Sequence, residues 1–441
     1  MGRWLPVVML LGCGPVHGWS DGGVEEEADA DLVPADTAAP AAMDAVPAPD
    51  AAAPDSASVS TVEALPLSTC GRWIVDRNRR RVKLAGVNWY GASDTELVPG
   101  GLDKVTMMSV AATIRGLGFN SVRLPFSNEM LHVTKPVAPA DVAANPPLAG
   151  KTPLEVLDAA VEALTGAGLY VILNNHSTHA MWCCNYDQDG LWYTAESSEE
   201  DWIADWELVV ARYAANPRVV GADLRNEIRI AMPIGFGILP RVPSWGGGGQ
   251  NDWAAAATRA AKRIQARNPD LLIIVEGLNS ADDLTGAAAR PIALTVPNKL
   301  VYEAHQYGFF RPGAPAIPGL GGPTYSTMTA AALASASRQQ WGFLTDPGKP
   351  FTAPLWLGEF GDGAGSDPKW LTNLVEYLRS LDADFAYWAL NGGPKAAGGA
   401  EPFGLLEDDW TTVRKDWRLD LLRSMQPATR GPGVSTSDGC P

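Results

Sequence analysis

Two short apolar segments of the 441-residue chain end in carboxylates. Residues 219–228 read VVGADLRNEI and carry the pair Asn226-Glu227, and residues 354–361 read PLWLGEFG and carry Glu359. One such carboxylate alone is equally well explained by a salt bridge, because charged side chains are mostly exposed. Two carboxylates from the ends of different strands, however, supply what glycoside hydrolysis requires, namely a proton donor and a nucleophile or base.

Apolar strand-like segments alternate with amphipathic helix-like segments from residue 72 onward. We expect strands at residues 81–89, 119–124, 169–173, 219–228, 271–275, 299–304, 354–358 and 384–390. We expect helices at residues 103–118, 154–168, 199–215, 251–268, 328–343, 368–381 and 409–424. This alternation over about 350 residues favours an α/β fold of the (β/α)8 (TIM) barrel type. A doubly wound open sheet is the competitor, but no glycine-rich phosphate turn follows the first strand.

Catalytic side chains of a (β/α)8 barrel lie at the carboxyl ends of its strands. The predicted strand ends carry, in chain order, Trp89, Arg123, His176, Asn226 with Glu227, His305 with Tyr307, Glu359, and Trp388 with Asn391. Packing of an apolar core does not explain so many polar and aromatic residues at one rim. The fifth strand, which ends near Glu276 and Asn279, is less informative.

These strand ends form short motifs that resemble glycoside hydrolase family 5, the cellulase-type group of clan A. The motifs occur in the order Val122-Arg123-Leu124-Pro125, Asn175-His176, Arg225-Asn226-Glu227, His305-Gln306-Tyr307, Gly358-Glu359-Phe360-Gly361 and Tyr387-Trp388. Each motif alone is weak, whereas the ordered set is specific, and the resemblance covers residues 72–424. It implies an enzyme without cofactor or metal that hydrolyses a β-linked glycan of the glucan type, endo-acting rather than exo-acting.

The resemblance also implies the catalytic roles. Glu227 would be the acid/base and Glu359 the nucleophile of a retaining mechanism, with Arg123 holding Glu359 ionised and Tyr307 hydrogen-bonded to it. Electrostatics favour the same division, because a guanidinium lowers the pKa of a neighbouring carboxylate and burial raises that of a proton donor. Retention requires the two carboxyl groups to lie about 5 to 5.5 Å apart.

The other predicted site residues would contact the sugar. The resemblance implies that Asn226 binds the 2-hydroxyl group, that His176 and His305 line subsite −1, and that Trp388 is the stacking platform. Further predicted substrate contacts are Trp89, Asn391, Trp182, Trp192 and Trp245.

Three long loops would wall the cleft, at residues 177–193, 231–250 and 309–323. Trp182 and Trp192 in the first loop could be loop core or a sugar platform, and we favour the platform. Because the loops could deepen or partly close the cleft, exo action stays open.

The amino-terminal segment resembles a bacterial lipoprotein signal. An apolar run follows Arg3 and ends in Leu10-Leu11-Gly12-Cys13, and it is too short to span a bilayer. We therefore expect a signal peptide at residues 1–12 and lipidation of Cys13, with an ordinary secretory signal as the alternative. Residues 13–66, rich in Ala, Pro and acidic residues, would be a disordered tether before the barrel domain at residues 67–441. The protein would then be exported to the outer membrane or cell surface, or alternatively secreted.

The formal net charge of −16 lies mostly in this tether. Residues 14–63 contain eleven Asp or Glu and no Lys or Arg, and Arg3 adds one positive charge, which leaves −6 for the remainder. The folded region is only mildly acidic, so we expect no nucleic-acid partner. We expect a monomer that meets the membrane only through its lipid anchor.

Four cysteines remain besides Cys13, an even number that suits an exported protein. Cys70 and Cys440 flank the folded region and are candidates for a bridge that joins its ends. Cys183 and Cys184 are adjacent and are candidates for a vicinal disulfide. Other pairings stay open at this point.

Two rival functions are weaker. A metal-dependent hydrolase could use His176 and His179 with Asp187 or Asp189, but such barrels usually draw more ligands from more strands. A surface lipoprotein that binds glycan without cleaving it would not need both carboxylates. Within the family, mannan, xyloglucan and glycolipid stay open as substrates beside glucan.

Overall fold

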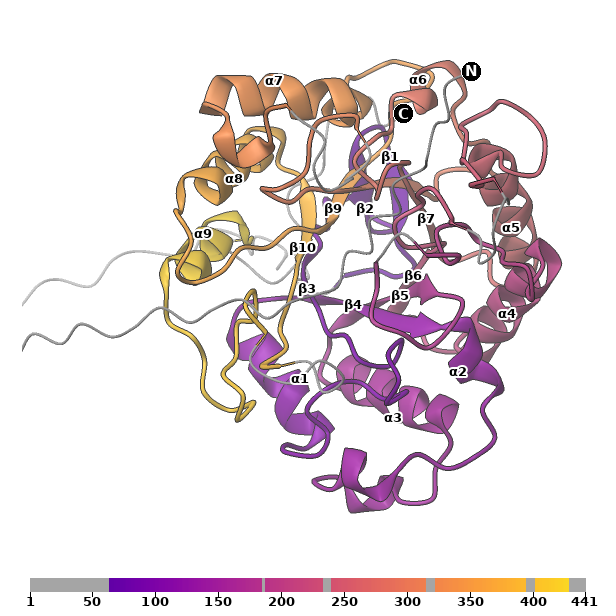
Figure 1. Cartoon of the computed structure of the whole chain (residues 1–441), viewed down its shortest axis with the longest axis vertical. Helices are drawn as coiled ribbons and strands as arrows, with labels where there is room; N and C mark the ends of the chain where they lie inside the picture. The colour runs from indigo at the N-terminus through magenta and orange to yellow at the C-terminus, as the bar shows by residue number, and fades with distance from the viewer. Residues whose placement is uncertain (1–62, 185–186, 233–238, 315–321, 394–400, 428–441) are drawn as a thin grey trace, which may run out of the picture. The chain divides into compact units, whose positions relative to one another are not determined.

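The computed structural model describes residues 63–184, 187–232, 239–314, 322–393 and 401–427. Within these ranges eight parallel strands form a closed barrel, in which each strand pairs with the next and the last pairs with the first (Figure 1). They are β3 (Ala85–Asn88), β4 (Ser121–Ser127), β5 (Tyr170–Ser177), β6 (Val219–Asp223), β7 (Leu272–Glu276), β8 (Leu300–His305), β9 (Leu355–Glu359) and β10 (Asp384–Tyr387). The predicted (β/α)8 fold is confirmed.

Helices cover the outside of the barrel (Figure 1). The longer ones are α1 (Met107–Gly116), α3 (Pro153–Gly166), α4 (Glu199–Arg212), α5 (Trp253–Arg267), α7 (Ala330–Gln340), α8 (Lys369–Leu381) and α9 (Trp417–Met425), and the short ones are α2 (Asn128–His132) and α6 (Gly286–Ala289). Thr152 and Ser198 begin α3 and α4 with reciprocal capping boxes, which satisfy backbone N–H groups that a helix leaves free. No helix of the described ranges has the length and apolar character that a membrane span needs.

The last predicted helix, residues 409–424, begins later than expected. Asp409 accepts hydrogen bonds from the backbone N–H groups of Thr411 and Thr412, which folds this stretch into a turn. Asp416 then caps α9. A short antiparallel pair, β1 (Ser68–Cys70) and β2 (Trp73–Val75), precedes the barrel and was not predicted.

The predicted signal peptide and most of the predicted tether lie outside the described residues, as do Cys13 and Cys440. The described chain is already packed before residue 67. The carbonyl group of Ala64 accepts a hydrogen bond of 2.8 Å from the Arg77 N–H group, and Leu65 packs against the barrel core. The last residues assigned to the tether therefore belong to the folded domain.

An apolar cluster fills the amino-terminal half of the barrel. Its members are Leu67, Ile74, Val82, Leu84, Tyr170, Ile172, Val220, Leu272, Ile274, Val301, Trp356 and Ala386. Every one of them is buried, and they come from the first residues of the strands and from the segment around β2. Polar side chains of the strands gather at the opposite, carboxyl end of the barrel.

Gly358 in β9 allows a buried acid to approach this carboxyl end. A Cβ atom at this position would lie 1.6 Å from the Glu303 Oε1 atom. Glu303 is fully buried, and the same oxygen is 3.2 Å from Arg123 and 3.2 Å from His305. The side chain therefore cannot move aside without losing both contacts.

We expect Gly358→Ala to lower the free energy of unfolding by about 1 to 3 kcal/mol, as overpacking of a core does. Chemical denaturation measures this change. The matched control is Gly166→Ala at the end of α3, where a Cβ atom would meet nothing within 4 Å. That variant should be as stable as the unmodified protein or slightly more stable. Equal destabilisation by both substitutions would contradict the proposed clash.

Candidate active site

Glu227 and Glu359 meet at the carboxyl end of the barrel. Glu227 follows β6, Glu359 ends β9, and the two residues are 8% and 4% exposed. One carboxylate oxygen of each lies within 4.8 Å of the other. This separation suits a retaining glycosidase, whose carboxyl groups are about 5 to 5.5 Å apart, rather than an inverting one at about 6.5 to 9.5 Å.

Arg123 of β4 lies at the centre of the site and is fully buried. Its Nη1 atom donates to Glu359 Oε1 at 2.5 Å, and its Nη2 atom donates to Asn226 Oδ1 at 2.8 Å. Its further carboxylate partners are Asp223 at 2.8 Å, Glu276 at 3.0 Å and Glu303 at 3.2 Å. One guanidinium thus fixes Glu359 and Asn226 relative to each other.

Glu276, at the end of β7, is a site residue, although its strand end was the least informative in the sequence. One of its oxygens accepts a bond from Arg123, and the other accepts the backbone N–H of Glu227 at 2.6 Å. Glu227 has a φ angle of 48°, a left-handed conformation that costs a non-glycine residue of order 1 to 3 kcal/mol. Glu276 holds that conformation in place. The available signal was the segment Leu272–Glu276, which also ends an apolar strand in a carboxylate.

His305 and Tyr307 both contact the carboxylate pair. The His305 Nδ1 atom lies 3.3 Å from Glu227 and 3.7 Å from Glu359, and burial lowers the pKa of this imidazole to about 4. The ring is therefore neutral near pH 7. The Tyr307 hydroxyl donates to Glu359 Oε2 at 3.0 Å.

Burial raises the pKa of the Glu227 carboxyl group, which suits a proton donor. The nearby positive charges of Arg229 and Arg123 and a hydrogen bond from Ser280 oppose this rise.

Burial also raises the pKa of Glu359, although His305, Arg123 and Tyr307 act to lower it. Arg123 thus lowers the pKa of Glu359, as expected, but the opposing effect of desolvation is larger. Hydrogen bonds still distinguish the two acids, because Glu359 accepts one from Arg123 and one from Tyr307.

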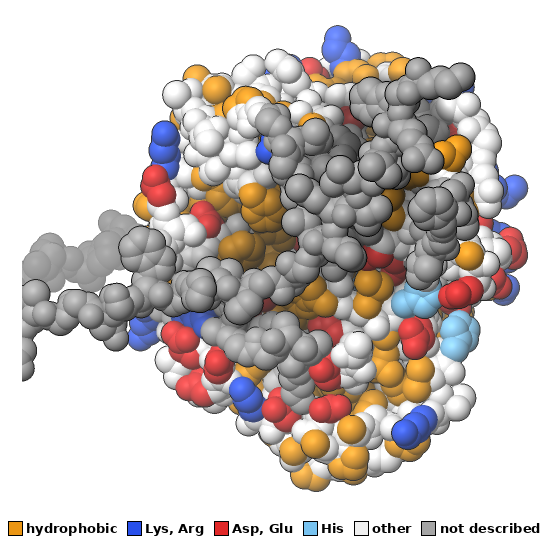
Figure 2. Space-filling view, in the orientation of Figure 1, with side chains coloured by type: hydrophobic (Ala, Val, Ile, Leu, Met, Phe, Trp, Pro, Cys, Tyr) orange, Lys and Arg blue, Asp and Glu red, His pale blue; other side chains and the backbone are white. Residues whose placement is uncertain are grey.

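The two glutamates open into a cavity of about 470 Å³. Its lining residues are His176, Trp182, Cys183, Cys184, Asn226, Glu227, Ser280, Tyr307, Phe309, Phe310, Arg311, Glu359, Trp388 and Phe403. In Figure 2 hydrophobic side chains gather near the centre of the face, and Lys and Arg side chains lie toward its edge. Aromatic walls with a few polar groups are typical of a sugar-binding site.

Trp388 is the centre of an aromatic group in this cavity. It stacks on Tyr90 with ring centroids 4.9 Å apart and on His176 at 5.7 Å. Trp182 meets Tyr90 and Trp388 edge-on and is 37% exposed. Trp182 and Trp388 are thus placed to contact a ligand.

Four of the predicted substrate contacts do not line this cavity. Trp89 is fully buried and donates to the Gly100 carbonyl group. Asn391 is also buried and bonds the backbone of Tyr90.

The other two residues, Trp192 and Trp245, belong to loop packing. Trp192 packs among Trp202 and Trp253 and donates to Glu199. Trp245 packs on Tyr302 and donates to the Arg290 carbonyl group. Each indole therefore stabilises the protein and does not line the cavity.

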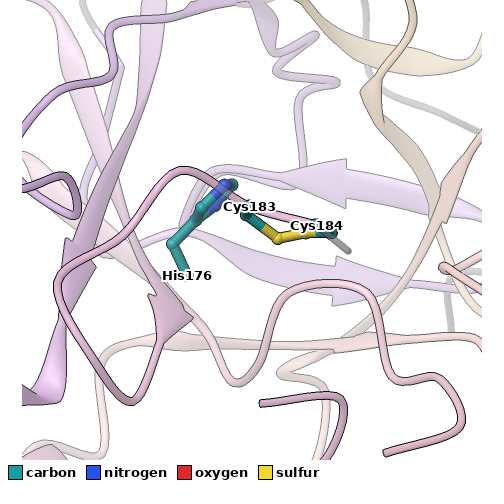
Figure 3. Close-up of side chains that lie close together, drawn as sticks. All are labelled: His176, Cys183 and Cys184. Carbon is teal, nitrogen blue, oxygen red and sulfur yellow. A yellow bond between two sulfur atoms is a disulfide. The ribbon is translucent and has the colours of Figure 1, made fainter. Parts of the chain in front are cut away.

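Cys183 and Cys184 form the predicted vicinal disulfide, which lies beside His176 (Figure 3). Cys70 is also disulfide-bonded, and its predicted partner Cys440 lies outside the described residues.

The residues proposed for a metal site are engaged in ion pairs instead. Asp187 pairs with Arg229 at 3.2 Å and Asp189 with Arg225 at 2.8 Å. His179 lies 3.3 Å from Glu196. Among the described residues, none of these three joins His176 in a group that could hold a metal ion.

Comparisons with known proteins agree on one family. Residues 75–394 match the family described as Cellulase (glycosyl hydrolase family 5). The chain is 33% identical over 390 residues to an endoglucanase of Paenibacillus polymyxa, which covers 85% of this chain and 90% of that one. It is 32% identical over 372 residues to the major extracellular endoglucanase of Xanthomonas campestris pv. campestris, at 80% and 70% coverage.

Solved structures give the same result. The catalytic domain of the major Xanthomonas campestris endoglucanase superimposes with a TM-score of 0.68 at 30% identity, covering 82% of this chain and 99% of that chain. A hyperthermophilic endocellulase of Pyrococcus horikoshii gives a TM-score of 0.68 at 26% identity, covering 84% and 100%.

The charge of Arg229 predicts a shift in the pH–rate profile. If Glu227 must be protonated to act, the rate of β-glucan hydrolysis, in which the leaving sugar oxygen needs a proton, falls as pH rises through the pKa of Glu227. Arg229→Gln removes a charge that favours the ionised form, so this basic limb should move to higher pH by up to about one unit. Arg229→Lys keeps the charge and should leave the limb near its original position. A limb that moves to lower pH in Arg229→Gln would contradict the assignment.

Proposed function

The chain belongs to glycosyl hydrolase family 5 and is a glycoside hydrolase, and on this premise we propose that it cleaves internal linkages of a β-linked glucan with retention of anomeric configuration. The observation that carries the mechanism is the pair Glu227 and Glu359, with carboxylate oxygens within 4.8 Å.

Glu359 is the nucleophile in this proposal. Its carboxylate attacks the anomeric carbon while the bond to the leaving oxygen breaks, and Glu227 gives its proton to that oxygen. Arg123 and Tyr307 each bind one oxygen of Glu359, which orients the attacking group. A glycosyl ester of Glu359 results. Glu227, now ionised, then takes a proton from water as the water attacks the anomeric carbon, and the ester bond breaks.

Asn226 is placed to bind the sugar next to the reacting carbon. Arg123 bonds both Asn226 and Glu359, so the Asn226 amide lies directly beside the nucleophile. The 2-hydroxyl group is the hydroxyl nearest to the anomeric carbon. Hydrogen bonds to this group strengthen in the transition state of such reactions.

A β-glucan is the best-supported substrate. The relatives named above are endoglucanases, which favours glucan over mannan, xyloglucan or glycolipid and endo over exo action. An endocellulase variant from Pyrococcus horikoshii, 27% identical to this chain, has been solved as a complex with cellotetraose. Trp182 and Trp388 supply aromatic surface for glucose rings in the cavity.

Alanine variants of the two acids should fail differently. Glu359→Ala should lose at least about 10³-fold in kcat, because no glycosyl ester can form. Azide that fills the vacated space should give an inverted product. Glu227→Ala should still form the ester from a substrate with a good leaving group, and this ester should accumulate. Azide should then restore turnover with retention.

Proton NMR of the first sugar released by the unmodified enzyme provides the deciding measurement. The initial product should have the configuration of the substrate. An inverted initial product would exclude the retaining assignment, whatever the alanine variants do. Release of only monomer or dimer from the chain ends of a soluble β-glucan would exclude endo action.

We also propose that the protein is exported as a lipoprotein anchored through Cys13, in the outer membrane or at the cell surface. The motif Leu10-Leu11-Gly12-Cys13 and the acidic, proline-rich stretch after it support this proposal. An extended tether of this composition would hold the catalytic domain away from the lipid, where a polymeric substrate has access. Secretion without an anchor is the alternative.

The anchor is tested by phase partition after expression in a bacterial host. The unmodified protein should enter a detergent phase, and Cys13→Ala should stay in the aqueous phase because no lipid can be attached. Cys70→Ala leaves the amino-terminal motif intact and should partition like the unmodified protein. Identical partition of all three proteins would exclude lipidation at Cys13.

A further inference from the structure

The Cys183–Cys184 disulfide is part of the cavity wall (Figure 3). The Asn226 amide nitrogen lies 3.3 Å from the Cys184 Sγ atom and 3.5 Å from the Cys183 Sγ atom. The Oδ1 atom of the same amide is held by Arg123, so the amide group has one orientation. The nitrogen of Asn226 therefore faces both sulfur atoms at the edge of the cavity.

Sulfur is a weak hydrogen-bond acceptor. A sugar hydroxyl would be a better partner for the Asn226 N–H groups, so this donor can pass from the disulfide to a ligand. A hydroxyl oxygen bonded to it would lie about 2.9 Å from the nitrogen. By the sum of the two distances, that oxygen is at most about 6 Å from the Cys184 sulfur. The disulfide consequently borders the position of a hydroxyl bound at Asn226.

We propose that the Cys183–Cys184 disulfide is a specificity-determining contact for the 2-hydroxyl side of the sugar whose bond is cleaved. This inference rests on the proposed function, because the neighbour of Asn226, Glu359, is the nucleophile only in that mechanism. The two linked sulfur atoms border the Asn226 amide nitrogen, which also faces the cavity. A sugar binds well when its 2-hydroxyl group reaches the Asn226 amide. A hydroxyl group that points at the disulfide instead finds only sulfur, which is a weak hydrogen-bond acceptor.

The contact depends on the oxidised state. A phosphine reductant that supplies two electrons, with two protons from water, breaks the S–S bond, gives two thiols and becomes a phosphine oxide. The two sulfur atoms are then no longer bonded to each other and carry S–H groups that can donate. Reduction should therefore weaken discrimination at the 2-hydroxyl group.

The test combines a change in the protein with a change in the substrate. The double variant Cys183→Ala/Cys184→Ala and the unmodified enzyme are compared on 4-nitrophenyl β-cellobioside. Both are also compared on the analogue that lacks the 2-hydroxyl group on the sugar next to the aryl group. We expect kcat/KM of the double variant to fall about tenfold on the first substrate and less than about threefold on the second. Equal losses on both substrates would indicate only a general effect on the loop and would overturn the proposal.

Reduction gives an independent route if the double variant is unstable. Phosphine treatment of the unmodified enzyme should produce the same selective loss, with thiol labelling at Cys183 and Cys184 verified by mass spectrometry. Cys70→Ala removes the disulfide of Cys70 and should keep the full response to the reductant, whereas the double variant should not respond. An unchanged substrate ratio after complete reduction would also overturn the proposal. Failure of the oxidised enzyme to cleave either substrate would instead refute the proposed function.

Discussion

A single buried guanidinium is shared by four carboxyl groups. Arg123 lies within 3.2 Å of an oxygen of each of Asp223, Glu276, Glu303 and Glu359. One positive charge cannot balance four negative charges in a medium of low dielectric constant, so some of these groups must be protonated. Burial raises the pKa of Glu276 and of Glu303 well above the ordinary value, which favours their neutral forms. The positive charge then remains available to Glu359.

The same cluster sets the geometry of the site. Arg123 connects Glu359 to Asn226, and Glu276 connects Arg123 to the backbone of Glu227. The two catalytic carboxylates therefore belong to one network that spans β4, β7 and β9, in which Glu359 ends β9 and the backbone of Glu227, which follows β6, is held by Glu276 of β7. A group held by several rigid strands stays within the narrow range of positions that a two-carboxylate mechanism tolerates.

The sequence predicted the barrel and most of the cavity because both leave periodic signals. Alternating strand and helix patterns located the strands, and polar residues at their ends located Arg123, Glu227 and Glu359. Residues buried inside the barrel, such as Glu303, had no such signal, since their partners come from distant strands. An aromatic residue at a strand end or in a loop looks the same in sequence whether it faces a ligand or the core, so the sequence did not show that Trp89, Trp192 and Trp245 pack away from the cavity. The adjacent cysteines predicted a disulfide but not its direction toward Asn226, which depends on how the whole loop packs.

The apolar cluster in the amino-terminal half of the barrel divides the protein into two functional layers. Tyr170, Ile172, Ile274 and Trp356 contribute to stability and lie below the layer in which the carboxylates meet. Since the lower layer contains none of the groups that touch substrate, its packing can be varied with little effect on selectivity. The loops at the carboxyl end of the barrel can vary in sequence while the apolar cluster stays the same. Engineering for heat resistance and engineering for new substrates would thus act on different residues, and improvements found separately should combine almost additively.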